Sequence, residues 1–408
     1  MKRIFISLFF FAFMWTAAGA DASPELLFVR WPANPDAVWY SFRIVPVTQH
    51  FGRKEMRPPI YEDGHVFRDS VMIEKEITDS YDGPGILCCQ VKAIGLDGQS
   101  ISAYSAPVPM EKAAQEMERY APKIRVKYHE QNGTVLLYPA YSFVKIPHAV
   151  SYEVEITDEE PENPDGCEPS VHRISQGIVT IPELFDELPR QGTVWWRVRG
   201  LDEDGGPVGV WSEAEKIVND PAENWETGIL GDSISHGGGR MSYSPADWPY
   251  NYAYYLDFPT INMSRSGDKT EDLLRRFDAD VLPFHVQYLL IMGGTNNLRS
   301  GETAEEVIAD LEALQEKCRS GGIEPVLLTI PPIAPERILK YYHQPTAENW
   351  KAEFDKVNGW IRTQTHIDTA APFAMYEDMP ENLAADGLHP DKEAKEKMGK
   401  IINEKFSE

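Results

Sequence analysis

A serine, a histidine and an aspartate near the C-terminal end of the chain are of the types, and at the spacing, that acyl transfer needs. Ser233 stands in the run Gly231-Asp232-Ser233, and Asp386 precedes His389 by three residues. A serine hydroxyl is a poor nucleophile until an imidazole accepts its proton, and the imidazole needs a carboxylate to hold its tautomer. None of the other nine of the ten histidines has an aspartate at that spacing. We therefore predict Ser233 as nucleophile, His389 as base and Asp386 as its orienting partner.

Acyl transfer also needs hydrogen-bond donors for the oxyanion that develops on the substrate. The backbone N–H groups of Ser233 and Gly267 and the side-chain amide of Asn296 are the candidates. Each removed donor costs roughly 3 to 4 kcal/mol of barrier. Structural roles are the alternatives: a helix cap for Ser233, a loop cap for Asn296 and a surface turn for His389.

The elements that must position these residues alternate between apolar runs and helical patterns from Trp225 onward. Short, continuously apolar strands joined by helices predict a parallel sheet covered on both faces. The runs that indicate strands are residues 229–230, 260–263, 288–292 and 326–330. Ser233, Gly267 and Asn296 each follow one of these runs. Ligands bind beyond the carboxyl ends of such strands, so we expect the three segments to meet in one crevice.

These motifs, in this order, make residues 226–408 resemble the SGNH/GDSL hydrolase superfamily. The family is named for the serine, glycine, asparagine and histidine that stand here as Ser233, Gly267, Asn296 and His389. The resemblance implies a three-layer α/β/α sandwich with a parallel sheet. It also implies ester hydrolysis through those residues and Asp386, with no metal and no organic cofactor.

The third motif departs from the family pattern. The family usually has Gly-x-Asn-Asp at this place, whereas this chain has Asn297 at the last position. The departure leaves open only the hydrogen bonds that this aspartate would make.

The first half of the chain repeats itself. The strand-like segment around Val91 matches the one around Val198, and Tyr104 matches Trp211, both at an offset of 107. Period-2 alternation between turn residues predicts two tandem all-β sandwich domains, and the pattern resembles fibronectin type III. We expect these domains to act as spacers or packing supports, with glycan or partner binding as the alternative.

The expected domain boundaries follow from these patterns. They are a signal peptide at 1–20, β-sandwiches at 21–112 and 121–219, a helical linker at 111–120 between them, and the hydrolase domain at 225–408.

The first twenty residues have the pattern of a secretory signal. Lys2-Arg3 precedes an apolar stretch over residues 4–15, and Ala18-Gly19-Ala20 offers small residues for cleavage. We expect an exported protein, periplasmic or extracellular, that is soluble and does not insert into a membrane. A net charge of −25 and a pI near 4.8 make nucleic acid an unsuitable partner. The four cysteines are expected to be unpaired, with a bridge from Cys167 to Cys88 as the alternative.

The substrate is indicated by aromatic residues near the motifs. Trp248, Tyr250 and Tyr342 could stack on a sugar ring, although core packing would also explain them. Long apolar runs that would line an acyl groove are missing there. We expect an ester substrate with a short acyl group, and our hypothesis is an O-acetylated polysaccharide. A lipase or lysophospholipase-type acyl hydrolase and a catalytically silent glycan-binding protein are the alternatives.

Overall fold

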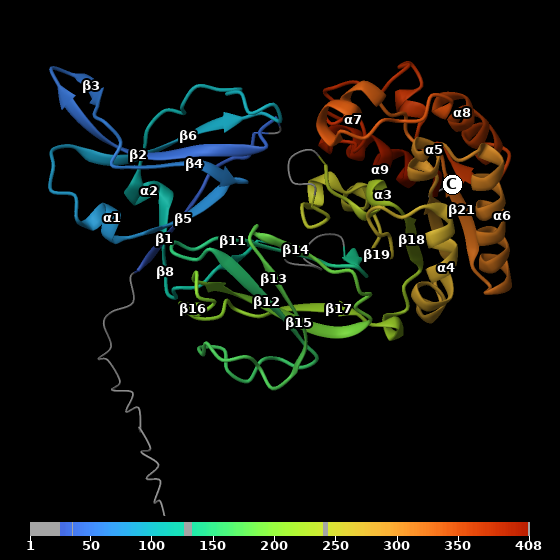
Figure 1. Cartoon of the computed structure of the whole chain (residues 1–408), viewed down its shortest axis with the longest axis horizontal. Helices are drawn as coiled ribbons and strands as arrows, with labels where there is room; N and C mark the ends of the chain where they lie inside the picture. Colours follow the sequence, from blue (N-terminus) through green and yellow to red (C-terminus); the bar gives the residue numbers. More distant parts are fainter. Residues whose placement is uncertain (1–24, 35, 126–132, 240–243, 407–408) are drawn as a thin grey trace, which may run out of the picture.

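The computed structural model of the protein describes residues 25–34, 36–125, 133–239 and 244–406. The predicted signal peptide at 1–20 lies outside the described residues. Figure 1 shows three units in chain order: a first β unit in blue, a second in green, and an α/β unit from yellow to red. Within the described part of the chain, no helix is long and apolar enough to cross a membrane.

The first β unit consists of two sheets that share one core. A three-stranded sheet in the order β5-β1-β8 faces a second sheet in the order β3-β2-β6-β7, with β4 paired to β2. Phe42 and Ile44 alternate inward from β2 and meet Val29 of β1. The elements are β1 (Leu26–Arg30), β2 (Trp39–His50), β3 (Arg53–Met56), β4 (Tyr61–Phe67), β5 (Ser70–Glu74), α1 (Glu76–Asp79), β6 (Ile86–Ile94) and β7 (Val108–Pro109).

The helical linker that we expected at 111–120 is wrong for most of its length. Only the single turn α2 (Met110–Ala113) is helical, and the chain continues as β8 (Ala114–Met117). β8 pairs antiparallel with β1, so the edge of the first sheet supplies hydrogen-bond partners that outweigh a weak helical propensity. Because β8 belongs to the first β unit, this unit extends to Met117, five residues beyond the predicted boundary at residue 112.

The second β unit repeats this two-sheet arrangement. A sheet in the order β14-β11-β9 faces one in the order β13-β12-β15-β16, with β17 paired to β15. Tyr141, Val154 and Trp196 meet in the shared core. The elements are β9 (Lys123–Ile124), β11 (Ala140–Val144), β12 (Ser151–Thr157), β13 (Arg173–Val179), β14 (Glu183–Phe185), β15 (Gly192–Leu201), β16 (Pro207–Val208), β17 (Glu215–Asn219) and η1 (Pro221–Glu223).

The α/β unit is built on a parallel six-stranded sheet. Its order is β10-β19-β18-β20-β21-β22, and all neighbouring pairs are parallel. The strands are β10 (Val135–Leu136), β18 (Thr227–Gly231), β19 (Thr260–Asn262), β20 (Tyr288–Met292), β21 (Glu324–Leu328) and β22 (His366–Ile367). The helices are α3 (Ser233–His236), η2 (Trp248–Tyr250), η3 (Tyr252–Tyr255), α4 (Thr270–Asp280), η4 (Leu282–Phe284), α5 (Thr295–Ser300), α6 (Ala304–Ser320), α7 (Pro335–Tyr342), α8 (Trp350–Ile361), η5 (Ala371–Phe373) and α9 (Lys392–Phe406).

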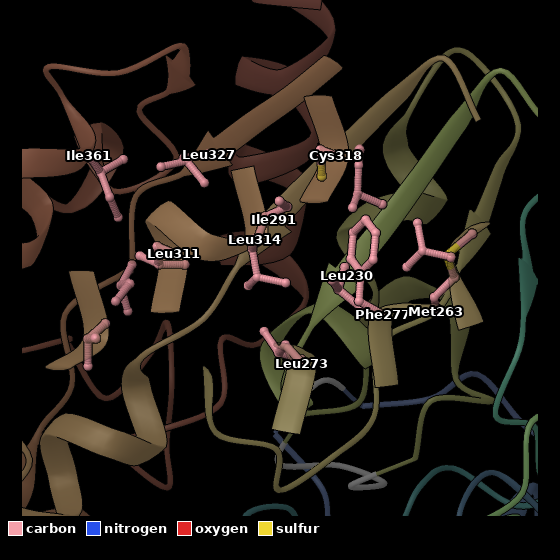
Figure 2. Close-up of a cluster of buried hydrophobic side chains, with 14 of the residues drawn as sticks. Leu230, Met263, Leu273, Phe277, Ile291, Leu311, Leu314, Cys318, Leu327 and Ile361 are labelled. Atoms are coloured by element: carbon pink, nitrogen blue, oxygen red, sulfur yellow. The ribbon is translucent and has the colours of Figure 1, made fainter. Parts of the chain in front are cut away.

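Both faces of this sheet are buried, which explains why its strands are continuously apolar. Ile291 of β20 points to the face that is covered by α4 and α6, where Figure 2 shows it near Leu314. The neighbouring Leu290 and Met292 belong to the opposite core, with Met398 of α9. Cys318 of α6 also lies in the first core, and all four cysteines of the chain are unpaired. The result is a three-layer α/β arrangement.

The edge strand β10 comes from an unexpected part of the chain. Val135 and Leu136 precede the main strands of the second β unit, yet they pair in parallel with Ile261 and Asn262 of β19. Val135 and Tyr138 are buried in the core of the α/β unit. The hydrolase sheet therefore begins well before residue 225.

Candidate active site

Ser233 lies at the turn between β18 and α3. Every residue of β18 is buried, and the strand ends at Gly231, where a Cβ atom would lie 2.6 Å from the carbonyl oxygen of Met292. The side chain of Asp232 caps α3 by accepting a hydrogen bond from the backbone N–H of Ile234 at 2.9 Å. Close packing and this cap together fix the first residue of α3, Ser233, at the carboxyl end of the sheet.

A hydrogen-bonded chain connects Ser233 to His389 and Asp386. Ser233 Oγ lies 3.0 Å from His389 Nε2, and His389 Nδ1 lies 2.8 Å from Asp386 Oδ2. A carboxylate accepts, so Nδ1 carries the hydrogen and Nε2 is left to accept from the serine. The three side chains that the sequence singled out are thus adjacent and in the order that proton transfer needs.

Asp386 is held in its ionised form. The backbone N–H groups of Leu388 and His389 donate to its Oδ1 at 2.7 and 2.8 Å. Complete burial would raise the pKa of Asp386, but the His389 imidazole and the hydrogen bonds outweigh it and lower the pKa to about 2. Asp386 can therefore stabilise an imidazolium on His389 across the neutral range.

Tyr342 contacts the same carboxylate, a role that we did not predict. Its hydroxyl donates to Asp386 Oδ2 at 2.7 Å, and its ring packs edge-on against His389. We had expected Tyr342 to bind a sugar. It lies 44 residues from Asp386 in the sequence, so no local spacing could have indicated the contact.

The two other oxyanion candidates lie on a loop after β19 and at the start of α5. Gly267 has φ +90°, and no heavy atom lies within 4 Å of the position that a Cβ would take. The left-handed backbone favours glycine there, and the space beside it is open. Asn296, in the first turn of α5, donates one amide hydrogen to the carbonyl of Asp268 at 2.9 Å. Since an amide nitrogen carries two hydrogens, that contact orients the second.

Asn297 uses its amide where the family usually has a carboxylate. Its Nδ2 donates to Glu271 at 2.9 Å and to Glu302 at 2.6 Å, while its Oδ1 accepts from the backbone N–H of Thr270 at 3.0 Å. Two carboxylates need a donor between them, so an aspartate would not fit this loop. The departure from the family motif is thereby compensated locally.

The other two aromatic residues proposed for sugar binding do not reach the site. Trp248 is 6% exposed and packs in the core of the second β unit, and Tyr250 is 8% exposed and packs in the core of the first. Stacking on a sugar requires an open ring face, so this expectation is wrong for both. Core packing, the alternative, is what the structure shows.

The comparisons with known proteins concern the part of the chain that carries this site. The model of the GDSL-like Lipase/Acylhydrolase family matches residues 229–397, which include every residue of the proposed site. Residues 229–397 belong to this family. Because it contains this domain, the chain is a hydrolase of the esterase/acylhydrolase type.

The GDSL domain is similar to a curated protein and to solved structures. The "Thioesterase 1/protease 1/lysophospholipase L1" of Escherichia coli K12 is 29% identical over 171 residues, which cover 41% of this chain and 76% of that protein. The lipase/acylhydrolase from Enterococcus faecalis is 25% identical with a TM-score of 0.35, covering 44% of this chain and 95% of that one. An acetyl-xylooligosaccharide esterase from Geobacillus is 17% identical with a TM-score of 0.34, covering 45% of this chain and 94% of that one.

Proposed function

We propose that this protein is an exported serine ester hydrolase that removes acetyl or other short acyl groups from a carbohydrate. The hydrogen-bonded chain of Ser233, His389 and Asp386, inside a GDSL domain, is the observation that carries the catalytic part. The secretory pattern of residues 1–20 supports export.

The proposed reaction has two steps. His389 Nε2 takes the proton of Ser233 as Oγ attacks the ester carbonyl, and His389 then returns that proton to the leaving alcohol as the C–O bond breaks. A water molecule, deprotonated by His389, next attacks the acyl-serine and releases the carboxylic acid and the free hydroxyl of Ser233. Asp386 stabilises the imidazolium in both steps.

The oxyanion of each tetrahedral intermediate would be held by three donors. These are the backbone N–H groups of Ser233 and Gly267 and the second amide hydrogen of Asn296. The donors come from the ends of three successive parallel strands, which the sheet holds in fixed relation. Such fixed donors stabilise charge that appears only during the reaction, so they act on kcat rather than on KM.

A groove lined by Tyr341 and Ala385, the chain neighbours of Tyr342 and Asp386, supports a carbohydrate as the alcohol part of the substrate. It has a volume of about 540 Å³ and is lined by residues of the first β unit, of α7 and of the segment 381–385. Lys340 and Tyr341 line one side and Asp97 lines the other; Asp36, Gly95, Leu96, Ile101, Glu381, Asn382 and Ala385 complete it. An aromatic ring beside carboxylates and an amide suits the hydroxyl groups and apolar faces of sugars.

A series of chromogenic esters tests the acyl preference. We expect acetate esters to be hydrolysed fastest and octanoate esters at least about tenfold more slowly. The competing function is that of a lysophospholipase, which the name of the E. coli relative suggests. Rates that rise steadily with acyl length would favour it and contradict a short-acyl esterase.

Acetate release from acetylated polysaccharides tests whether a carbohydrate is the alcohol part of the substrate. Tyr341→Ala should lower kcat/KM about five- to tenfold on the polymer but leave it unchanged on a small acetate ester. Tyr376→Ala is the control, because Tyr376 is another solvent-accessible tyrosine of the GDSL domain, 40% exposed where Tyr341 is partly exposed, and it lies outside the groove. Equal effects of Tyr341→Ala on both substrates would contradict the groove as a carbohydrate site.

A further inference from the structure

His236, the last residue of α3, is fully buried and connects two segments on opposite sides of its ring. The backbone N–H of Ser266 donates to His236 Nδ1 at 3.2 Å, and Ser266 Oγ lies 3.0 Å from the same atom. Because Nδ1 accepts, the ring hydrogen is on Nε2, which donates to the backbone carbonyl of Tyr138 at 2.8 Å. The orientation of the ring therefore depends on Tyr138.

The contact with Ser266 reaches the oxyanion hole. Ser266 directly precedes Gly267, and the N–H of Ser266 is held by His236 while Gly267 has a left-handed backbone. The peptide plane that carries the Gly267 N–H includes the carbonyl of Ser266. The hydrogen bond between Ser266 and His236 therefore helps to fix the direction in which the Gly267 N–H points.

The side chain of Tyr138 reaches the loop of Asn296 by a second route. Its hydroxyl donates to Asp280 at 2.6 Å, and Arg276 donates to Asp280 at 2.9 Å and to Asp268 at 2.7 Å. The carbonyl of Asp268 in turn accepts the amide of Asn296. Every side chain between Tyr138 and Asp268 is at least nine-tenths buried, so each group depends on its neighbours for hydrogen bonds.

Tyr138 itself belongs to the part of the chain before the GDSL domain. It follows β10 closely, and Leu137 donates its N–H to the carbonyl of Asn262 at 2.8 Å. The family match begins only at residue 229. Both supports of the oxyanion loops therefore converge on a residue from outside that match.

We propose that Tyr138 is a positioning residue for the oxyanion hole: its carbonyl fixes the loop of Gly267, and its hydroxyl fixes the loop of Asn296. This inference rests on the proposed oxyanion roles of those two residues. It assigns to the upstream segment a part in catalysis, beyond that of a spacer. The segment acts by holding the two loops in place, through the backbone carbonyl and the side-chain hydroxyl of Tyr138.

Two substitutions of His236 separate its two contacts. His236→Asn keeps an acceptor near the Nδ1 position, whereas His236→Gln places its amide near the Nε2 position and gives up the contact with Ser266. On a small acetate ester we expect both variants to lower kcat about 10- to 100-fold, with KM within about twofold. Each variant breaks the connection between the Tyr138 carbonyl and Ser266 at a different end, and misplaced donors stabilise the oxyanion less.

Tyr138→Phe tests the second route with a smaller change. It removes one hydroxyl and should lower kcat about five- to tenfold without raising KM. Tyr152→Phe is the matched control, since Tyr152 is equally buried and its hydroxyl also makes hydrogen bonds, but to the backbone of Ile146 in the second β unit. Both variants should lose some thermal stability, and only Tyr138→Phe should lose kcat.

All rates are divided by the concentration of competent sites, measured as the endpoint of labelling with a fluorophosphonate. A merely structural role would lower that endpoint and leave kcat per site unchanged. Wild-type kcat per site in His236→Asn, which loses the Tyr138 carbonyl, or in Tyr138→Phe, or a change in KM alone, would overturn the inference while the esterase assignment stands. A full-length wild-type chain that hydrolyses no ester would overturn the proposed function, and this inference with it.

Discussion

Ser233 and His389 share one proton in the proposed reaction, and this makes a prediction about double variants. Ser233→Ala and His389→Ala should each lower kcat by at least about 10⁴-fold, and the double variant should be no slower than either, because triad members act as a unit. The measurement is kcat on an acetate ester for the three variants. Losses that multiply in the double variant would mean that the two residues act independently.

Asn297 makes a prediction about stability. Asn297→Asp would place a third carboxylate against Glu271 and Glu302 in a fully buried position. We expect it to lower the free energy of unfolding by roughly 2 to 4 kcal/mol, as for other buried groups that lose their partners. Urea unfolding measures the free energy of unfolding. Asn403→Asp is the control, because Asn403 of α9 also donates a hydrogen bond but is partly exposed, so its substitution should cost less. Equal stability of Asn297→Asp and wild type would show that the amide is not needed.

Among the elements, α9 contacts the nucleophile turn through a buried lysine. Lys395 is fully buried and donates to the carbonyl of Ile234 in α3. Burial lowers its pKa to about 7, although Asp232 and Asp391 oppose the shift. The amino group of Lys395 thus lies next to the turn that carries Ser233.

The lowered pKa of Lys395 predicts how stability depends on pH. Between pH 7 and 10.5 the unfolded chain keeps a proton on this lysine that the folded chain releases, so stability should rise with pH in that window. Lys395→Met should flatten the rise. Unfolding free energies from urea titrations at pH 7, 8 and 9 measure it, and an unchanged slope in the variant would show that Lys395 is not the group responsible.

The elements also show which parts of the structure could be predicted from the sequence. β18, β20 and β21 fall within a few residues of the predicted runs because a sheet that is buried on both faces requires continuous apolar strands. β8 and β10 were missed because short strands are stabilised by a partner distant in the sequence, and local composition does not reveal that partner.

The candidate site divides in the same way. Asp386 and His389 could be paired because they are three residues apart, whereas Tyr342 reaches the same carboxylate only through the fold. Trp248 and Tyr250 were misplaced because aromatic residues are common both in cores and in sugar sites. The burial of Trp248 and Tyr250 decides between these roles, and it depends on how the β units pack against this segment of the α/β unit.

For the whole molecule, one arginine connects all three units. Arg68 of the first β unit is 3% exposed and bonds Glu183 of the second at 2.5 Å, and it also forms an ion pair with Asp247 of the α/β unit. Burial raises the pKa of Glu183 to about 6 even with Arg68 beside it. The three units are therefore joined by a buried ionic cluster as well as by linkers.

Arg68→Ala should consequently destabilise the whole molecule. Removal of Arg68 takes the ion-pair partner from the buried Glu183 carboxylate, and loss of such a partner costs about 3 to 5 kcal/mol. Arg30→Ala is the control, because Arg30 pairs with Asp69 at 3.1 Å but is itself 68% exposed, and such a surface pair is worth less than about 1 kcal/mol. Similar losses in the two variants, measured by urea unfolding, would contradict a special role for the buried junction.

The central claim, that Ser233 is the nucleophile of an ester hydrolase, is tested most directly by covalent labelling of the full-length chain. The protein is treated with a fluorophosphonate, digested, and mapped by peptide mass spectrometry while acetate-ester hydrolysis is followed. We predict one adduct, on Ser233, whose formation parallels the loss of hydrolysis. Hydrolysis that persists after complete labelling of Ser233, or that disappears with an adduct on another residue, would contradict the account.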